Sequence, residues 1–428
     1  MGDVSLDSIQ TFGVENLKNT ESQGVLAPPG LDREVKKPSS WLLFFGLLTA
    51  VTMCSSAGTI FLLIPEVPPL MRAAWRLHAQ TIVQLVPFVI QYIQYLKNKP
   101  AIISKWRQNL HYMVFSGFFL GLHFGTWVWS LDHTTLAHSL MWVTMYPIFL
   151  NGGQWVLYGT IVVFIMKLKV AFCKSCCLKL LQERYFDSRE SLSRLRPTFL
   201  ETAGSIIGLA GGLVMLGDVE NTNAGEARPI DANHSAFGKP LASATAKKVT
   251  VEGDMMALAG AATMCVYLLV GKSLRTWAPI WLYMTPVAFS AACTCTIASL
   301  LLEDTTFEAL TPTSVFGFFS LAYIGYAFYL GGGAGVGGHT LVNTLLRYLS
   351  PLLVSTALLM EPLVGSLIGA IAGVQGIPGI YTFLGGPIVI CGLMMIVYGE
   401  SRKDDENDNL KRSKEANAQE TCGTKSTI

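Results

Sequence analysis

The chain has 428 residues, of which 51% are hydrophobic and only 14% are charged, and its mean hydropathy is +0.43. Soluble globular domains contain about 25% charged residues, so this composition excludes an ordinary soluble protein and favours a membrane protein with several spans. The formal net charge of +2 shows no basic excess of the kind that binds nucleic acid. The nine cysteines show no pattern of a disulfide framework.

Both ends of the chain are polar. Residues 1–39 are rich in Gly, Ser and Pro and contain no apolar core, so we expect a disordered tail and not a cleavable signal. Residues 399–428 are mostly charged and polar, and we expect a second disordered tail there.

Ten apolar segments lie between the tails. A transmembrane helix needs about 20 mainly apolar residues, and each segment is close to that length. We expect the fourth to bend at Pro147, because proline removes a helix hydrogen bond. The segments are Trp41–Ile64, Pro69–Tyr95, Met113–Leu131, Leu136–Met166, Phe199–Gly217, Asp254–Gly271, Trp277–Leu302, Val315–Gly333, Pro351–Gly373 and Tyr381–Tyr398.

Lys and Arg residues occupy alternate connections between these segments. They include Lys97, Lys99, Lys105 and Arg107, a basic insert at 167–196, Lys272 with Arg275, and Arg347, whereas the short connections between contain none. Because positive loops stay in the cytosol, we expect an integral membrane protein with both termini cytosolic, in the plasma membrane or an endomembrane. The polar loop 218–253 would lie on the other side, where Asn233 begins a candidate glycosylation triplet.

An internal repeat is visible at an offset of 215, where Ser130–Pro147 aligns with Leu345–Pro362. A second match aligns Gly204 and Gly211 with Gly385 and Gly392 at an offset of 181. The two offsets differ by about the length of the basic insert, so one repeat accounts for both matches if the first half carries the insert as an additional loop.

Residues 41–217 and 254–398 therefore read as two repeats of five helices each. Because five is odd, the second repeat would enter the membrane from the opposite side. The predicted fold class is an all-α integral membrane protein of ten transmembrane helices in two inverted five-helix repeats, with its site between the halves.

The run GHTLVNTLLRYLSPLLVSTALLMEPLVGSLIGAIAG, which begins at Gly338, is followed by Gly385, Gly386 and Gly392. It resembles the second repeat of the EamA-like family in the drug/metabolite transporter superfamily. Arg76, Pro147 and the pair Gly204 and Gly211 agree more loosely with the first repeat. The resemblance covers about residues 41–398 and implies a ten-helix transporter with a central substrate cavity.

The chain departs from that family in three places. Gln375-Gly376 stands where family members often have Gly-Glu, and the basic insert and the long loop 218–253 are unusual. The resemblance therefore implies the superfamily and not the substrate.

Polar side chains inside apolar helices are candidate functional groups, because the bilayer cannot satisfy them. His339 and Asn343 share a helix face and would either bind substrate, with His339 moving protons, or join helices by a hydrogen bond. Glu361 would either couple transport to protons or form a fixed ion pair. Arg76 would either neutralise an anionic substrate or snorkel to the outer interface.

Aromatic and small residues complete the candidate cavity. Trp127, Tyr146 and Tyr326 would line it or belong to the core. The glycine run would form either a locally broken helix at the cavity or a close helix contact, and Pro147 and Pro362 would act as hinges. The glycines concerned are Gly333, Gly335, Gly337 and Gly338.

The predicted function is a secondary transporter that moves a small organic metabolite across the bilayer by alternating access, with proton coupling and oligomeric state left open. No cofactor, metal or enzyme signature is present: His133 and His138 are five apart and point to different helix faces. The alternatives are a non-transporting scaffold or regulator with the same fold, and an antiporter for phosphorylated metabolites or nucleotide sugars.

Overall fold

The computed structural model describes residues 39–153, 155–156, 197–218, 249–275, 277–345, 348, 357–374 and 378–425. The basic insert 167–196, Arg347, Asn233 with most of its loop, and the first tail up to residue 38 lie outside these ranges. The chain divides into Met1–Leu42 and Leu43–Ile428. Only residues 39–42 of the first unit are described, and the account below concerns the second.

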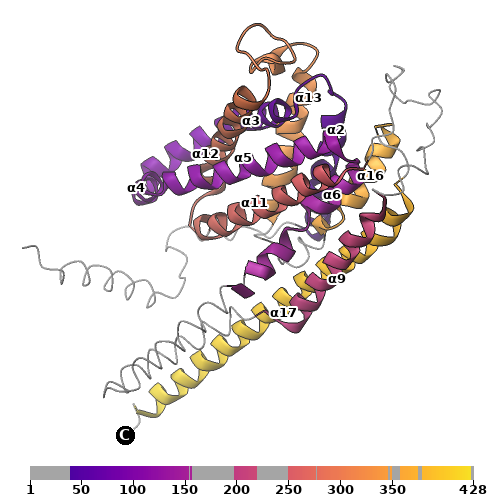
Figure 1. The fold of residues 1–428 in the computed structure, drawn as a ribbon. Helices are drawn as coiled ribbons and strands as arrows, with labels where there is room; N and C mark the ends of the chain where they lie inside the picture. The colour runs from indigo at the N-terminus through magenta and orange to yellow at the C-terminus, as the bar shows by residue number, and fades with distance from the viewer. Residues whose placement is uncertain are drawn as a thin grey trace, which may run out of the picture. The chain divides into compact units, whose positions relative to one another are not determined.

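The described residues form helices, and their one β-type pairing is an isolated bridge between Thr306 and Ser314 (Figure 1). In chain order the helices are α2 Ser40–Leu62, α3 Pro69–Asn98, α4 Pro100–Gln108, α5 Leu110–His133, α6 Leu136–Val143, α9 Phe199–Met215, α11 Val251–Arg275, α12 Ile280–Leu302, the 3₁₀-helix η2 Gly317–Phe319, α13 Ile324–Phe328, the π-helix η3 Tyr329–Thr340, α14 Leu341–Leu345, α16 Glu361–Ile371 and α17 Ile380–Lys425.

Five helices are long and apolar enough to cross a membrane: α2, α5, α11, α12 and the part of α17 from Ile380 to Lys403. Helices α9 and α16 are apolar but shorter. Helix α3 has 30 residues but is less apolar, because it carries Arg72 and Arg76 among other polar residues. The described part of the chain is thus an all-α fold with several membrane-spanning helices.

Two predicted spans contain a break immediately before a proline. Helix α6 ends at Val143, Thr144 and Met145 form a turn, and helical backbone resumes at Tyr146. Pro147 has no N–H to donate to the carbonyl four residues earlier, which belongs to Val143. In the same way Leu359 and Met360 form a turn before α16 begins at Glu361.

The predicted span 315–333 is not one α-helix. It consists of η2, α13 and the start of η3, whose π-type hydrogen bonds join residues five apart. Accordingly the hydroxyl of Thr340 donates to the carbonyl of Gly335 at 3.3 Å. The glycine run is therefore a widened helix, and the backbone remains hydrogen-bonded through it.

The segment after residue 399 is helical where we expected disorder. Helix α17 continues to Lys425, and its polar part alternates charges that can pair along the helix, as Arg402 and Glu406 do at 4.0 Å. Such pairs four residues apart stabilise an exposed helix.

Helices α9 and α17 lie side by side in antiparallel orientation (Figure 1). A Cβ atom on Gly204 would lie 2.5 Å from the carbonyl oxygen of Gly392, and one on Gly211 would lie 2.9 Å from that of Gly385. Only glycine permits this approach of two backbones, which is the usual device for packing helices in lipid.

Helix α3 packs antiparallel to α12. At one end Glu303 accepts from the N–H groups of Leu70 and Met71, and at the other Gln91 accepts from the N–H of Trp281. Helix α5 lies against both α11 and α12, and α6 lies against α16. This packing holds the first half of α3, from Leu70 to Gln80, inside the protein.

Candidate functional site

Arg76, at the second turn of α3, is completely buried. Its guanidinium carbon lies 4.0 Å from the centre of the Phe124 ring, a cation–π contact. Its Nε, Nη1 and Nη2 atoms have no hydrogen-bond partner in the part of the chain that the structure describes. The expectation that Arg76 snorkels is therefore wrong, because α12 and α5 enclose α3 and the side chain stays inside.

Arg72, one turn earlier on α3, is equally buried but is paired. Its Nη1 donates to the carbonyl of Phe61 at 2.9 Å, and its Nη2 forms an ion pair with Asp132. Burial of an unpaired charge is costly. The fold thus neutralises one buried arginine of α3 with an ion pair, whereas the other contacts an aromatic ring and has no hydrogen-bonded partner among the described residues.

Helices from both halves of the chain meet Arg76. Its charge interacts with Glu361 of α16 and with Cys54 of α2, although no ion pair joins Arg76 to Glu361 among the described residues. The His339 ring lies edge-on to Phe124 with centres 5.9 Å apart. Three of the residues that the sequence singled out, Arg76, His339 and Glu361, are therefore brought together.

Unpaired neutral donors also lie on α2 and α5, the helices that carry Cys54 and Phe124. Ser55 and Thr59, one turn apart on α2, are buried, and neither hydroxyl has a hydrogen-bond partner in the described chain. The same holds for Nε1 of Trp127 on α5. Gly58, which precedes Thr59, would place a Cβ 3.8 Å from the Trp127 ring, so α2 and α5 are in contact at these residues.

We define the Arg76 site as these buried groups, the partly buried side chains of His339 and Glu361, and the aromatic rings of Phe124 and Trp127. His123 also belongs to the site. Its ring is held in place by a hydrogen bond between its Nδ1 and the carbonyl of Gly260 at 2.9 Å. The site comprises Cys54, Ser55, Thr59, Arg76, His123, Phe124, Trp127, His339 and Glu361.

Other predicted residues lie outside the site. The amide of Asn343 donates to the carbonyl of His339 at 2.8 Å and accepts from Nη1 of Arg275, so it joins α14 to α11 as the structural alternative expected. The carbonyl of Tyr146 accepts from the thiol of Cys265 at 3.2 Å. Tyr326, on α13, is half-buried against the hydrophobic core.

The glycine run of η3 packs closely against neighbouring helices. A Cβ on Gly335 would lie 2.7 Å from the Gln80 side chain, and one on Gly338 would lie 2.7 Å from the Cys54 sulfur. Gly333 and Gly337 have more room, with no contact shorter than 3.5 Å. The close-packing interpretation therefore holds for Gly335 and Gly338, and Gly338 also brings η3 to the Arg76 site.

The two prolines stand at helix starts, just beyond turns. Pro362 is buried in the first turn of α16, a position that suits its missing N–H. Glu361, which the sequence placed in mid-helix, is the first residue of that helix. Pro147 follows the turn after α6.

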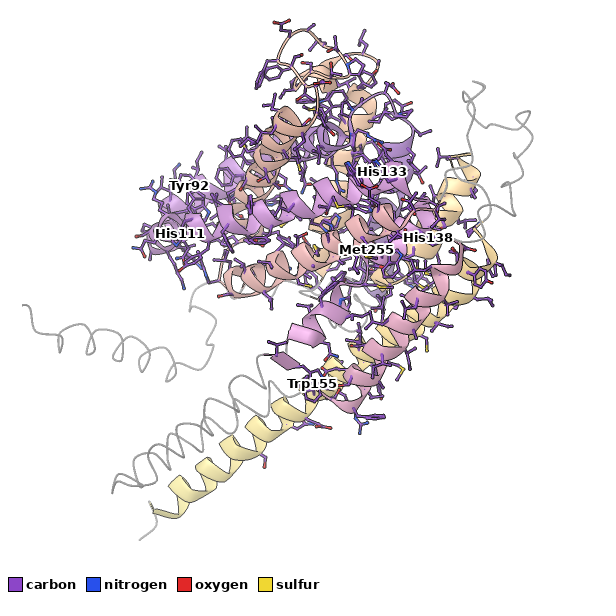
Figure 2. The ribbon with its side chains drawn as sticks, viewed as in Figure 1. Tyr92, His111, His133, His138, Trp155 and Met255 are labelled. Atoms are coloured by element: carbon purple, nitrogen blue, oxygen red, sulfur yellow. The ribbon has the colours of Figure 1, made fainter. Side chains whose placement is uncertain are left out.

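A second buried polar cluster surrounds His138 of α6 (Figure 2). Its Nδ1 lies 2.9 Å from the carboxylate of Asp254, and its Nε2 lies 2.7 Å from the hydroxyl of Thr382. That hydroxyl donates to Asp218 at 2.6 Å, and Thr134 donates to Asp254 at 2.7 Å. We call these five residues the His138 network.

The network connects four parts of the fold. The Thr382 hydroxyl donates its single hydrogen to Asp218, so its oxygen is free to accept from Nε2 of His138. Nδ1 of the same ring is hydrogen-bonded to Asp254. Through these contacts His138 joins α6 to α11, to the end of α9 and to the start of α17.

The sequence did not identify Ser55, Thr59 or the partners of His138. Asp218 and Asp254 stand at the ends of apolar segments, where charged residues are ordinary. Hydroxyl side chains in an apolar helix commonly donate a hydrogen bond to the carbonyl four residues earlier, as Thr144 does to Leu140. The signal available for Ser55 and Thr59 was their spacing of four residues, which places both on one helix face.

No protein-family profile matches this sequence, and no curated protein matches it. One solved structure, described only as "Crystal structure of protein", is similar with a TM-score of 0.39 and 16% sequence identity, over 83% of this chain and 96% of that one. Nothing about function is inferred from that similarity.

Proposed function

We propose that this protein is a secondary transporter that moves a small organic metabolite across a membrane by alternating access, with both termini in the cytosol. The observation that carries the proposal is Arg76, a buried cation whose three nitrogen atoms have no hydrogen-bond partner in the described ranges of the chain. A polar group unsatisfied in a membrane-embedded fold is expected to serve a ligand. The site draws residues from 41–217 and from 254–398, the two proposed repeats, as transporter sites commonly do.

The proposed inverted repeat is supported by the two helix breaks. The turn at Thr144 and Met145 and the turn at Leu359 and Met360 are separated by 215 residues, the offset at which the sequences align. Each turn ends two residues before a proline, Pro147 in the first case and Pro362 in the second. Equivalent segments of the two proposed repeats therefore share a local backbone irregularity.

Glycine contacts between α9 and α17 support the same relation. In the proposed repeat Gly204 is equivalent to Gly385, and Gly211 to Gly392. Gly204 meets Gly392, and Gly211 meets Gly385, so exchanging equivalent residues reproduces the contacts. That is the behaviour of two units related by a two-fold axis. The pairs α3 with α12 and α6 with α16 also join equivalent helices.

The experiment is reconstitution of the purified full chain in liposomes, followed by uptake and counterflow of a panel of labelled metabolites. We expect at least one solute to accumulate above the rate of empty liposomes. Arg76→Gln should abolish that uptake, and Arg107→Gln, which changes an arginine on α4 outside the site, should not.

Proton coupling of that uptake is tested separately. An imposed pH gradient should change the rate of the wild-type protein, and Glu361→Gln should remove the dependence if this carboxyl carries the proton. An uptake rate that does not change with the pH gradient excludes proton coupling. A panel in which no solute moves rejects transport and favours the non-transporting scaffold.

A further inference from the structure

Resting on the proposed function, we propose that the Arg76 site binds the carboxylate of a singly charged organic acid whose body is apolar. Among the described residues, the fully buried atoms of the site that have no hydrogen-bond partner are donors or hydroxyls that can donate: three guanidinium nitrogens, the indole N–H of Trp127 and the hydroxyls of Ser55 and Thr59. A ligand that satisfies them must present acceptor oxygens.

The guanidinium is suited to a carboxylate. Its contact with Phe124 is made through the carbon over the ring, which leaves its N–H groups free. These N–H groups form a planar fork that matches the two oxygens of a carboxylate, and such charge-assisted pairs are stronger than neutral hydrogen bonds.

Charge counting favours one negative charge on the ligand. Arg76 is the unpaired cation of the site, because Arg72 is already neutralised by Asp132. Glu361 adds a carboxyl within electrostatic range. With the Glu361 carboxyl protonated, a carboxylate balances the one guanidinium, whereas a phosphate monoester carries about −1.5 to −2 charges at pH 7 and would leave excess negative charge in the site.

Aromatic rings enclose the donors and suit an apolar body. The Trp127 ring lies 6.0 Å from that of Phe124 and meets the ring of Phe61 edge to face at 5.8 Å. All three side chains are buried. A ligand whose polar atoms are confined to one end would satisfy the donors there and contact these rings with its remainder.

The test is equilibrium binding to the purified full chain in lipid nanodiscs, with phenylacetate and hexanoate as probes. Each acid is compared with its neutral amide, phenylacetamide or hexanamide, and phenyl phosphate serves as the doubly charged probe. We expect the acids to raise the melting temperature and to bind at least about tenfold more tightly than their amides, a factor equal to 1.4 kcal/mol. Phenyl phosphate should bind more weakly than phenylacetate.

Variants assign the effect to the site. Arg76→Gln should weaken binding of the acid at least about tenfold and leave binding of the amide unchanged, because only the charged pair is lost. Arg76→Lys keeps the charge without the fork and should fall between. Arg107→Gln is the matched control and should bind as wild type. If Arg76→Gln does not fold, Trp127→Phe is used instead. This variant removes one N–H donor and should weaken binding of the acid a few fold.

The outcomes separate this inference from the proposed function. Acid binding that depends on Arg76, in a protein that moves no solute, supports the inference and rejects transport. Uptake of a neutral solute together with no acid binding supports transport and overturns the inference. Amides or phosphates that bind as tightly as the acids also overturn it.

Discussion

The Arg76 site and the His138 network both bury charged side chains, and they do so in opposite states. In the network each ring nitrogen of His138 faces an oxygen, and both carboxylates accept from neighbouring donors. In the Arg76 site the guanidinium nitrogens have no hydrogen-bond acceptor among the described residues. Burial of charge alone therefore does not indicate a binding site, and the proposal for Arg76 rests on its missing partners.

The largest expected effect follows from breaking the His138 network. His138→Ala removes the ring that is hydrogen-bonded to Asp254 and, through Thr382, connected to Asp218, and both carboxyl groups are buried. Removing the partner of a buried carboxylate costs about 3 to 5 kcal/mol. The melting temperature of the purified protein should fall sharply, and a variant that melts as wild type would show that the His138 network does not stabilise the fold.

Arg76→Met should act in the opposite direction. The variant removes a buried charge that the protein itself does not pair, and replacing buried ionic groups by apolar ones of similar size can stabilise by about 1 to 4 kcal/mol. We expect a higher melting temperature together with loss of uptake. If the variant is less stable than wild type, Arg76 is a structural residue and the contrast with His138 fails.

Gly204→Ala tests the helix pair from which the network takes two members, since Asp218 follows α9 and Thr382 lies at the start of α17. The new Cβ would lie 2.5 Å from the carbonyl oxygen of Gly392. Overpacking of this kind costs about 1 to 3 kcal/mol. The matched control is Gly325→Ala on α13, where a Cβ meets no atom within 4 Å. Equal melting temperatures for the two variants would contradict the close contact.

The smallest effect concerns Glu303, which follows the last residue of α12. Burial raises the pKa of its carboxyl above the ordinary value of 4.5, and the Ser299 hydroxyl, the N–H groups of Leu70 and Met71 and the charge of Arg72 oppose the rise. The folded state therefore holds this proton more tightly than the unfolded state does. That stabilisation is present below pH 4.5 and is lost as the pH rises through the folded pKa.

Glu303→Gln should remove this part of the pH dependence. Between pH 4.5 and neutrality the stability of the variant should vary less than that of wild type, and the difference should be small because the group is only half-buried. Melting curves at a series of pH values measure it. If the stability of the variant falls with rising pH as steeply as that of wild type, the pH dependence comes from another group.

The sequence predicts the helices well where an apolar run is continuous, as in α2, α5, α11 and α12. It also identifies Arg76, His339 and Glu361, because a charge in an apolar run is conspicuous by itself. It does not predict that Arg76 is buried, since seven residues from a helix start is compatible with snorkelling. Only the packing of α12 and α5 around α3 decides that question.

Residues whose role depends on partners far away in the sequence could not be predicted from the sequence. His138 meets Asp254 and Thr382, which are 116 and 244 residues away in sequence. No periodicity connects such positions, and each looks ordinary at the end of its own helix. The prediction of a disordered segment after residue 399 rested on its polarity, which does not distinguish disorder from an exposed helix stabilised by pairs such as Arg402 and Glu406.

The π-helix η3 makes the direction of the side chains after it depend on how its turns are hydrogen-bonded. A π-type turn bonds residues five apart, whereas an α-type turn bonds residues four apart, so converting one turn would shift the register of every later residue by one position. At 3.6 residues per turn that shift is a rotation of about 100°. Because η3 ends at Thr340, such a conversion would rotate Asn343 away from Arg275, and the hydrogen bond between these two side chains therefore fixes the register of α14.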